Sequence, residues 1–149
     1  FGSRLLALAP CPELPAVRNV LALQLISWQA SPRLATRCLS LLACDRRHDV
    51  AVQVLKAMRS SQVECNMFHY NAAINAFKNS GEWQSALRLL GEMSAVRLDA
   101  DIVSYNTAIS TCEKAAQWHS AIGLLVQMSN VRLQPNVISY NAAISACGK

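Results

Sequence analysis

The sequence lacks long hydrophobic runs and is poor in charged residues, glycine and proline. Charged residues make up 15% of the 149 residues, against about 25% in an average soluble domain. The longest nearly apolar run, Val20–Ile26, is far shorter than the roughly 20 residues of a bilayer-spanning helix, so no membrane segment is predicted. With 52% hydrophobic residues and only five glycines and five prolines, the composition excludes disordered and collagen-like chains.

The sequence also lacks the cysteine and histidine spacing of a zinc site. Its six cysteines include no C-x-x-C pair, and a buried free cysteine behaves as a small hydrophobe. We therefore expect free thiols, a reducing compartment and no metal or other cofactor. His48, His69 and His119 are dispersed without repeated acidic or cysteine partners, so we assign them no catalytic or metal-binding role. The net charge of +5 permits an anionic partner such as nucleic acid.

An internal repeat of 35 residues is the strongest feature of the sequence. The segments Met67–Ile74, Ile102–Ile109 and Val137–Ile144 align, each with a Tyr-Asn dipeptide at the same place. Gly81–Met93 and Ala116–Met128 align at the same shift. Several anchors at one shift indicate a repeat protein.

The repeat divides the chain into units. We assign three whole repeats, 32–66, 67–101 and 102–136, of which the first is a worn copy whose pattern is only partly kept. Residues 137–149 are interpreted as the first helix of a truncated repeat, so a longer array is expected. Residues 1–31 are interpreted as a degenerate half-repeat or a cap, because Pro15 falls where a helix interior is expected.

Each unit predicts two helices. In the first helix of 67–101, apolar residues recur at i, i+3, i+4 and i+7, on one helical face: Tyr70, Ala73, Ile74 and Phe77. The predicted apolar stripes of the second helices are Trp83, Ala86, Leu87, Leu90 and Met93, and then Trp118, Ala121, Ile122, Leu125 and Met128. Cys112 and Cys147 replace Phe77 and are predicted to be buried, and the charged run Asp45–Asp49 is predicted to be a solvated turn. Because one hairpin cannot bury such faces alone, the pattern predicts an all-α fold, an α-solenoid of stacked helix-turn-helix repeats.

A second stripe, of polar residues, lies on another face of each first helix. Its members are Asn71, Asn75 and Lys78 in one unit, Asn106, Ser110 and Lys114 in the next, and Asn141, Ser145 and Lys149 in the last. Stacking the units would join the stripes into one polar, mildly basic surface. Amide side chains both donate and accept hydrogen bonds, which suits the reading of base edges.

With its 35-residue unit, its Tyr-Asn dipeptide and the closing Gln134-Pro135-Asn136, the sequence resembles the pentatricopeptide repeat (PPR) family. The resemblance covers about 32–149 and is strongest over 67–149. Tetratricopeptide repeats are the nearest alternative, but they have 34 residues and a Trp in the first helix. Here Trp83 and Trp118 open the second helix.

The resemblance implies sequence-selective binding of single-stranded RNA at one base per repeat, in RNA processing or stability, in a mitochondrion or plastid. In this family, the residue after the Tyr and the last residue of the unit select the base. These positions are Thr36 with Asn66, Asn71 with Asp101, Asn106 with Asn136, and Asn141 in the last unit. The family tendency then predicts adenine, uracil and a pyrimidine, with cytosine favoured, from 5′ to 3′.

The resemblance implies two further sets of RNA contacts. The base-stacking positions are Phe68, Val103 and Ile138. The phosphate-contacting positions are Lys114 and Lys149, with Lys78 substituting next to Asn79.

Other interpretations of these residues stay open. Asn66, Asp101 and Asn136 each precede a predicted helix, where Asn and Asp are favourable N-caps, and the three base-stacking positions could instead belong to the core. An α-solenoid also offers a groove for peptides, so a protein–protein interaction scaffold is the alternative function. No nucleophile–base constellation is recognisable, and we predict no enzymatic activity.

Overall fold

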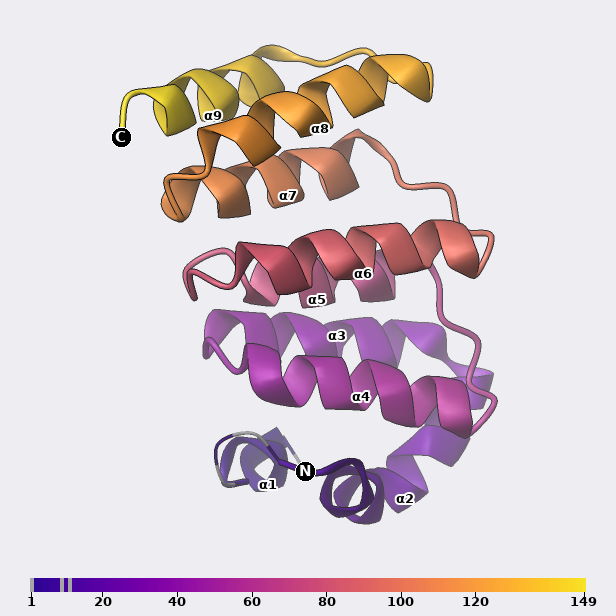
Figure 1. Ribbon diagram of the computed structural model, residues 1–149. Coiled ribbons are helices and arrows are strands. Elements are labelled where there is room, and N and C mark those ends of the chain that lie inside the picture. Colours follow the sequence, from indigo (N-terminus) through magenta and orange to yellow (C-terminus); the bar gives the residue numbers. More distant parts are fainter. Residues whose placement is uncertain (1, 9, 11) are drawn as a thin grey trace. The chain divides into compact units, whose positions relative to one another are not determined.

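The computed structural model describes residues 2–8, 10 and 12–149, and this part of the chain contains helices and no strands (Figure 1). The predicted all-α helical-repeat fold is therefore confirmed. Contacts divide the chain into two compact units, Phe1–Ala76 and Phe77–Lys149. The first unit contains α1 (Gly2–Leu6), α2 (Leu14–Ala30), α3 (Pro32–Cys44), α4 (His48–Ser60) and α5 (Met67–Ala76). The second contains α6 (Trp83–Ala95), α7 (Ile102–Lys114), α8 (Trp118–Asn130) and α9 (Val137–Cys147).

The starts of the helices follow the period of the sequence. Helices α3, α5, α7 and α9 begin 35 residues apart, and so do α4, α6 and α8. Helix α2 begins at Leu14, so that Pro15 lies in its first turn. The expectation that Pro15 interrupts a helix is wrong, because a proline in the first turn removes only an N–H that has no helical partner.

The core of the first unit forms where α3 packs against α4 and α5, and α2 against α4. Figure 1 shows α3 and α4 side by side. Leu39 of α3, Met58 of α4 and Ile74 of α5 are fully buried. Burial of each such side chain stabilises the fold by about 1.5–3 kcal/mol, and each lies at a position that the periodicity predicts.

In the second unit, α7 packs against α6, α8 and α9, with Ile109, Cys112 and Met128 fully buried. The predicted stripe of the second helices is partly wrong. Leu124 is buried, whereas Ile122 and Trp118 are 40% and 44% exposed. Side chains of successive residues point in directions about 100° apart around the helix axis. The buried side of α8 includes Leu124 and Met128, and Ile122 lies at the edge of that side. Leu89 is likewise buried in α6, beside Leu90.

The apolar side of α9 is exposed. Tyr140 and Ile144 are 52% and 68% exposed, and Cys147 on the same side is exposed too, so its predicted burial is wrong. The equivalent residues of α7, Tyr105 and Ile109, are 4% and 0% exposed. The same sequence pattern is therefore a core face in α7 and a surface in α9, because only in α7 do neighbouring helices cover that side.

The described cysteines, Cys38, Cys44, Cys65, Cys112 and Cys147, are free, and Cys11 lies outside the described residues. Burial raises the pKa of Cys38 to about 12 and that of Cys112 to about 11. Both thiols therefore stay protonated at neutral pH and serve as small apolar side chains.

Residues with a left-handed backbone conformation end the helices, and they recur with the period of the repeat. Gln62, Arg97 and Arg132 have φ of 57°, 59° and 62°. Each follows the C-cap of a second helix, and the next residue donates its N–H back to a methionine carbonyl, as in Leu98 N to Met93 O at 2.8 Å. This is the Schellman arrangement, which satisfies carbonyls at a helix end. The turns after the first helices have a matching series, Arg46, Gly81 and Ala116, with φ of 57°, 78° and 54°.

The charged turn between α3 and α4 is not simply solvated, contrary to the prediction for Asp45–Asp49. Arg47 forms a bidentate ion pair with Asp49, with N–O distances of 3.0 Å. Its guanidinium also donates to the carbonyls of Leu6 and Leu8, at 2.7 and 3.1 Å. Arg47 thus holds the end of α1 against the rest of the first unit.

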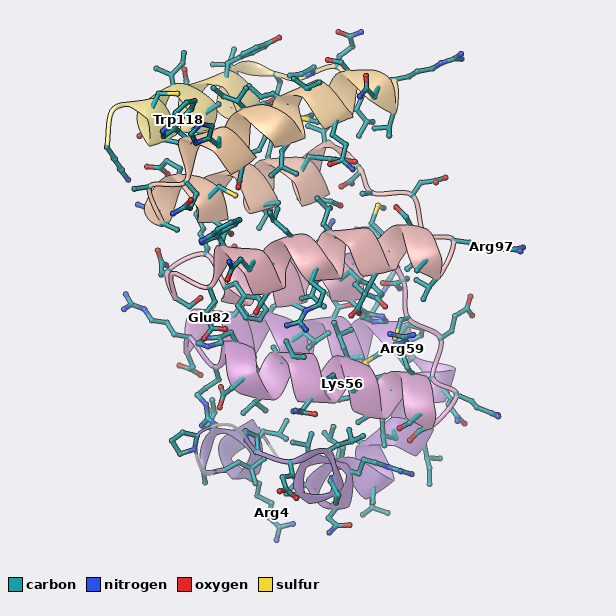
Figure 2. The ribbon with its side chains drawn as sticks, in the orientation of Figure 1. Arg4, Lys56, Arg59, Glu82, Arg97 and Trp118 are labelled. Carbon is teal, nitrogen blue, oxygen red and sulfur yellow. The ribbon has the colours of Figure 1, made fainter. Side chains whose placement is uncertain are left out.

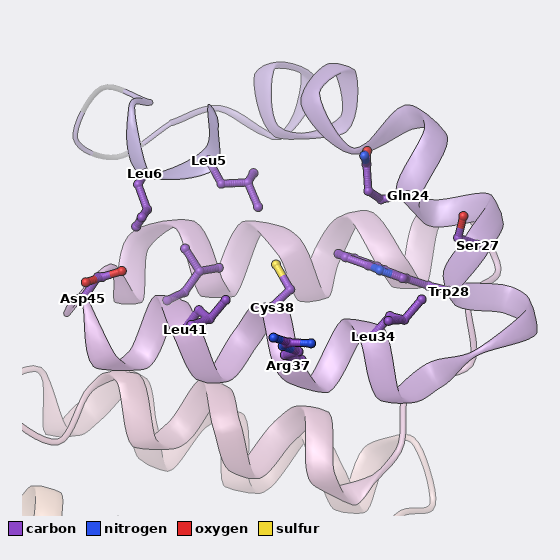
Figure 3. Close-up of a pocket in the computed structure, with 11 residues that line it drawn as sticks. Leu5, Leu6, Gln24, Ser27, Trp28, Leu34, Arg37, Cys38, Leu41 and Asp45 are labelled. Atoms are coloured by element: carbon purple, nitrogen blue, oxygen red, sulfur yellow. The ribbon is translucent and has the colours of Figure 1, made fainter. Parts of the chain in front are cut away.

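A cavity of about 640 Å³ lies between α1, α2 and α3 (Figure 3). Figure 3 shows the ring of Trp28 and the thiol of Cys38 pointing into this space. Leu5, Leu34 and Leu41 contribute apolar walls, and Arg37 lies at the cavity as well. None of the base-selecting candidates is among the residues that line this cavity.

The turn at Gly81 gives a test of the repeat geometry. A methyl group added there meets no atom within 4 Å, so Gly81→Ala changes only the backbone preference at a positive φ. We expect this substitution to lower the free energy of unfolding by about 1 kcal/mol. Gly91, inside α6, has equally open space, and Gly91→Ala is expected to raise it by about 0.5–1 kcal/mol. Denaturant unfolding followed by circular dichroism measures both, and changes of equal sign would contradict the turn assignment.

Candidate nucleic-acid interface

The first turns of α7 and α9 are closed by reciprocal hydrogen bonds of the capping-box type. Asp101 Oδ1 accepts from Ser104 N at 2.9 Å, and Asp101 N donates to Ser104 Oγ at 3.2 Å. Asn136 and Ser139 repeat this box, with both distances at 3.1 Å. The boxes satisfy backbone N–H groups that have no partner within the helix. Asp101 and Asn136 are therefore N-caps, and this role is compatible with base selection because it uses a single side-chain oxygen.

Helix α5 has the same box with a histidine in place of the serine. His69 N donates to Asn66 Oδ1 at 3.1 Å, and Asn66 N donates to His69 Nδ1 at 3.0 Å. His69 Nε2 lies 2.9 Å from the carbonyl oxygen of Pro32. Because a carbonyl can only accept, Nε2 carries the ring proton and Nδ1 is the acceptor. Burial lowers the pKa of His69 from 6.5, while its hydrogen bond to Pro32 opposes this shift.

His69 was predicted to have no catalytic or metal-binding role, and its capping role was not recognised from the sequence. The signal that identifies it is its register: His69, Ser104 and Ser139 are each the third residue of a first helix. All three are fully buried, and all three close the cap of their helix.

Asn106 and Asn136, one of the predicted base-selecting pairs, are in direct contact. Asn106 Nδ2 donates to Asn136 Oδ1 at 3.2 Å, across 30 residues of sequence. The hydroxyl of Ser139 donates to Asn106 Oδ1. Helix α7 supplies the first side chain and the N-terminus of α9 supplies the other two, and these helices pack against one another.

The other base-selecting candidates lie at the corresponding places. Thr36 is in α3 and donates its hydroxyl to the carbonyl of Pro32 at 3.4 Å, the same oxygen that His69 Nε2 reaches. Asn71 is in α5, and Asn141 is in α9 and exposed. Asn71 and its predicted partner Asp101 belong to different units, so that their pairing stays a prediction.

The predicted base-stacking residues are surface residues. Phe68, Val103 and Ile138 are 61%, 57% and 61% exposed, so the alternative that they belong to the core is wrong. Each is three residues before a base-selecting asparagine, which places the two side chains on one side of the helix. An exposed apolar group therefore accompanies each of these asparagines, of which Asn71 and Asn106 are half-buried and Asn141 is exposed.

The predicted phosphate contacts differ from one another. Lys114 is the last residue of α7 and is exposed, whereas Lys78 lies in the turn after α5. Lys149 Nζ is 2.6 Å from Glu113 Oε1, which also accepts from Ser145 Oγ at 3.0 Å. The hydrogen bond from Lys149 is the main cause that lowers the pKa of Glu113. The charge of Lys149 is thus balanced by a carboxylate.

Several basic and aromatic residues that the sequence did not assign to RNA contacts lie on the second helices and in the turns that follow them. Figure 2 shows Lys56 and Arg59 on α4 and Arg97 extending from the turn after α6. Trp118 opens α8, and its ring stacks on that of His119 with centroids 3.4 Å apart. Among the described residues no helix is long and apolar enough to cross a membrane.

The fold and the paired polar residues at the helix starts define a helical-repeat protein. Two family models match the chain: the PPR repeat family over residues 100–149 and the pentatricopeptide repeat domain over residues 53–115. Together they span residues 53–149, and the chain belongs to the pentatricopeptide repeat family. No curated protein matches the chain. Proteins of this family are generally RNA-binding repeat proteins without enzymatic activity, and they are commonly organellar.

His69 predicts a pH dependence of stability. Its pKa is lower in the folded chain than its ordinary value of 6.5, so the unfolded chain binds a proton first as the pH falls. The contribution of neutral His69 is fully present above pH 6.5 and is lost as the pH falls from there toward the folded-state pKa. His69→Ser gives α5 the same serine capping box as α7 and α9, but it leaves the Pro32 carbonyl without the donor Nε2. We expect it to be about 1–3 kcal/mol less stable at pH 8.

The measurement is thermal unfolding of both proteins between pH 8 and pH 5. The unfolding temperature of the wild type is expected to fall more steeply below pH 6.5 than that of His69→Ser, because the variant lacks the titrating group. Parallel curves for the two proteins would rule out a neutral, buried His69 at this cap.

Proposed function

We propose that this chain is a sequence-selective module that binds single-stranded RNA and reads one base per repeat. The repeats would be 32–66, 67–101 and 102–136, with 137–149 beginning another and 1–31 a degenerate half-repeat. The observation that carries this proposal is the bonded pair of Asn106 and Asn136, held at the start of a helix beside exposed apolar residues. Base-specific RNA recognition uses this combination of amide hydrogen bonds and stacking on exposed bases.

In this proposal, each base lies between side chains of successive repeats. Val103 and Ile138 supply apolar faces for the third base, and the amides of Asn106 and Asn136 meet its Watson–Crick edge. Thr36 with Asn66 would select adenine, and Asn71 with Asp101 would select uracil. Family membership further supports a role in RNA processing or stability, in a mitochondrion or plastid.

The affinity expected for this chain sets the choice of experiment. Stacking contributes about 1–3 kcal/mol per base, and the cost of association cancels a large part of the gain from three bases. The dissociation constant is then on the order of millimolar, which a nuclear magnetic resonance titration can follow. The trinucleotides AUC, AUU, AUA and AUG form the test series. Tighter binding of AUC and AUU than of AUA and AUG supports the proposal, while binding of no RNA would favour a protein-interaction scaffold.

Asn136→Asp tests the reading of the third base. Asp101 forms the same capping box in α7, so the aspartate keeps the cap and can still accept from Asn106 Nδ2. The change replaces the donor group Nδ2 by an acceptor oxygen. Uracil offers an N3–H donor where cytosine offers an acceptor, so preference is expected to move from AUC toward AUU by about fivefold, equivalent to about 1 kcal/mol.

The control for this change is Asp101→Asn, which makes the reverse substitution at the preceding repeat. It is expected to move preference at the second base from uracil toward cytosine and to leave the third base unaffected. If Asn136 is only an N-cap, Asn136→Asp leaves the ranking of the four trinucleotides as it is.

Glu113→Gln tests the place of Lys149 on this surface. Glutamine can still accept from Ser145, but it no longer balances the charge of Lys149. The freed ammonium group is expected to strengthen RNA binding at low salt. It is also expected to steepen the dependence of log Kd on log salt concentration by about 0.7, the value for one further phosphate on a single strand. Glu13→Gln changes the net charge equally at an exposed residue of the first unit, and a matching increase there would mean that Lys149 has no special part.

A further inference from the structure

The hydrogen bonds around Asn136 determine which atoms of the Asn106–Asn136 pair are left to meet a base. Ser139 N can only donate, so the atom of Asn136 that it meets at 3.1 Å must be the oxygen Oδ1. The atom of Asn106 that lies 3.2 Å from this oxygen must then be a donor, which is Nδ2. The orientation of both amides therefore follows from a backbone N–H, and it does not depend on a choice between oxygen and nitrogen positions.

The Ser139 hydroxyl completes this network. Its oxygen accepts from Asn136 N at 3.1 Å, and its single proton can go to Asn136 Oδ1 at 3.1 Å or to Asn106 Oδ1. Asn136 Oδ1 already accepts from two N–H donors, so the proton is better used on Asn106 Oδ1. Ser139 is fully buried, and no rotation of its hydroxyl toward solvent competes with this bond.

Both amide oxygens of the pair then accept hydrogen bonds within the protein, two at Asn136 Oδ1 and one, from the Ser139 hydroxyl, at Asn106 Oδ1. The groups of the pair for which no bond within the described residues is found are amide N–H donors. Asn136 Nδ2 and the second hydrogen of Asn106 Nδ2 are left to meet a ligand. Cytosine offers adjacent O2 and N3 acceptors to such donors. Uracil carries a hydrogen on N3, which would oppose a donor.

We propose that Ser139 is a specificity-determining positioning residue, which locks the Asn106 amide so that the preceding repeat presents donors only and prefers cytosine. This inference rests on the proposed RNA-binding function. The residue that decides between the two pyrimidines thus lies in the repeat after the one whose base it affects. A hydroxyl at the third position of a first helix acts on the base without touching it.

Ser104 supplies the matched control. It is the equivalent residue of α7, is equally buried and closes an equivalent box. Its hydroxyl donates to Asp101 Oδ1 at 2.9 Å, in the cap that belongs to the preceding predicted pair. Ser139→Ala and Ser104→Ala therefore remove the same group from the same kind of cap. Ser139→Thr keeps the hydroxyl and is the conservative rescue.

The experiment measures the ratio of Kd for AUU to Kd for AUC with the 149-residue chain and each variant. The wild type is expected to prefer AUC about fivefold, the size of one hydrogen bond. Ser139→Ala is expected to bring the ratio close to 1, because the freed Asn106 amide can turn its oxygen toward the N3–H of uracil. Ser104→Ala and Ser139→Thr are expected to keep the wild-type ratio.

A second readout needs no RNA. The side-chain NH₂ group of Asn106 is expected to exchange with solvent faster in Ser139→Ala than in the wild type or in Ser104→Ala. If the wild type binds neither trinucleotide, the proposed function fails. If it binds and prefers AUC, but folded Ser139→Ala keeps that preference and the slow exchange, the positioning role is overturned and RNA binding stands. If the wild type binds AUC and AUU equally, the inference that the Asn106–Asn136 pair presents only donors is overturned.

Discussion

The N-terminal cap that α5, α7 and α9 share is the contact on which both the fold and the proposed interface depend. An Asn or Asp before the helix and the third residue within it bond to each other's backbone N–H groups in α5, α7 and α9. The cap begins the helix, because otherwise these N–H groups lack partners. It also fixes the direction of the side chain that is predicted to select a base, so one interaction serves both local structure and the proposed recognition.

The chemistry of this cap differs between the two units, although the backbone arrangement of the cap is the same. In α9 the third residue, Ser139, reaches back to Asn106. In α5 the larger His69 fills this place and reaches the carbonyl of Pro32 instead. A serine hydroxyl can donate and accept at one atom, whereas a neutral imidazole does so at two atoms on opposite sides of a ring. The histidine therefore spans a longer gap and adds sensitivity to acid.

The spacing of repeats is set at the other ends of the helices. Residues in the left-handed conformation recur every 35 residues and end both helices of a repeat. Only Gly81 among them takes this conformation without strain. The apolar residue after these turns packs toward the core: Val63 is buried, with 3% exposure, and Leu98 and Leu133 are half-buried. Turn conformation and core packing thus fix the same register, which allows worn copies such as 32–66 to keep the fold.

The sequence by itself determined the period, the two helices of each unit and the central core positions such as Ile74 and Ile109. These follow from helical periodicity, which requires only that apolar residues share one face. It did not determine the edges of that face, and Trp118 and Ile122 were wrongly placed because burial at an edge depends on which neighbours are present.

Contacts between successive repeats were decided only by the tertiary structure. Asn106 with Asn136, His69 with Pro32, and Lys149 with Glu113 are separated by 30, 37 and 36 residues. Whether two such side chains meet depends on the packing distance between stacked helices and on side-chain rotamers, to within the narrow length range of a hydrogen bond. The periodicity of a sequence does not contain that distance. It therefore predicted which residues select bases, but it could not show the hydrogen bond from Ser139 to Asn106.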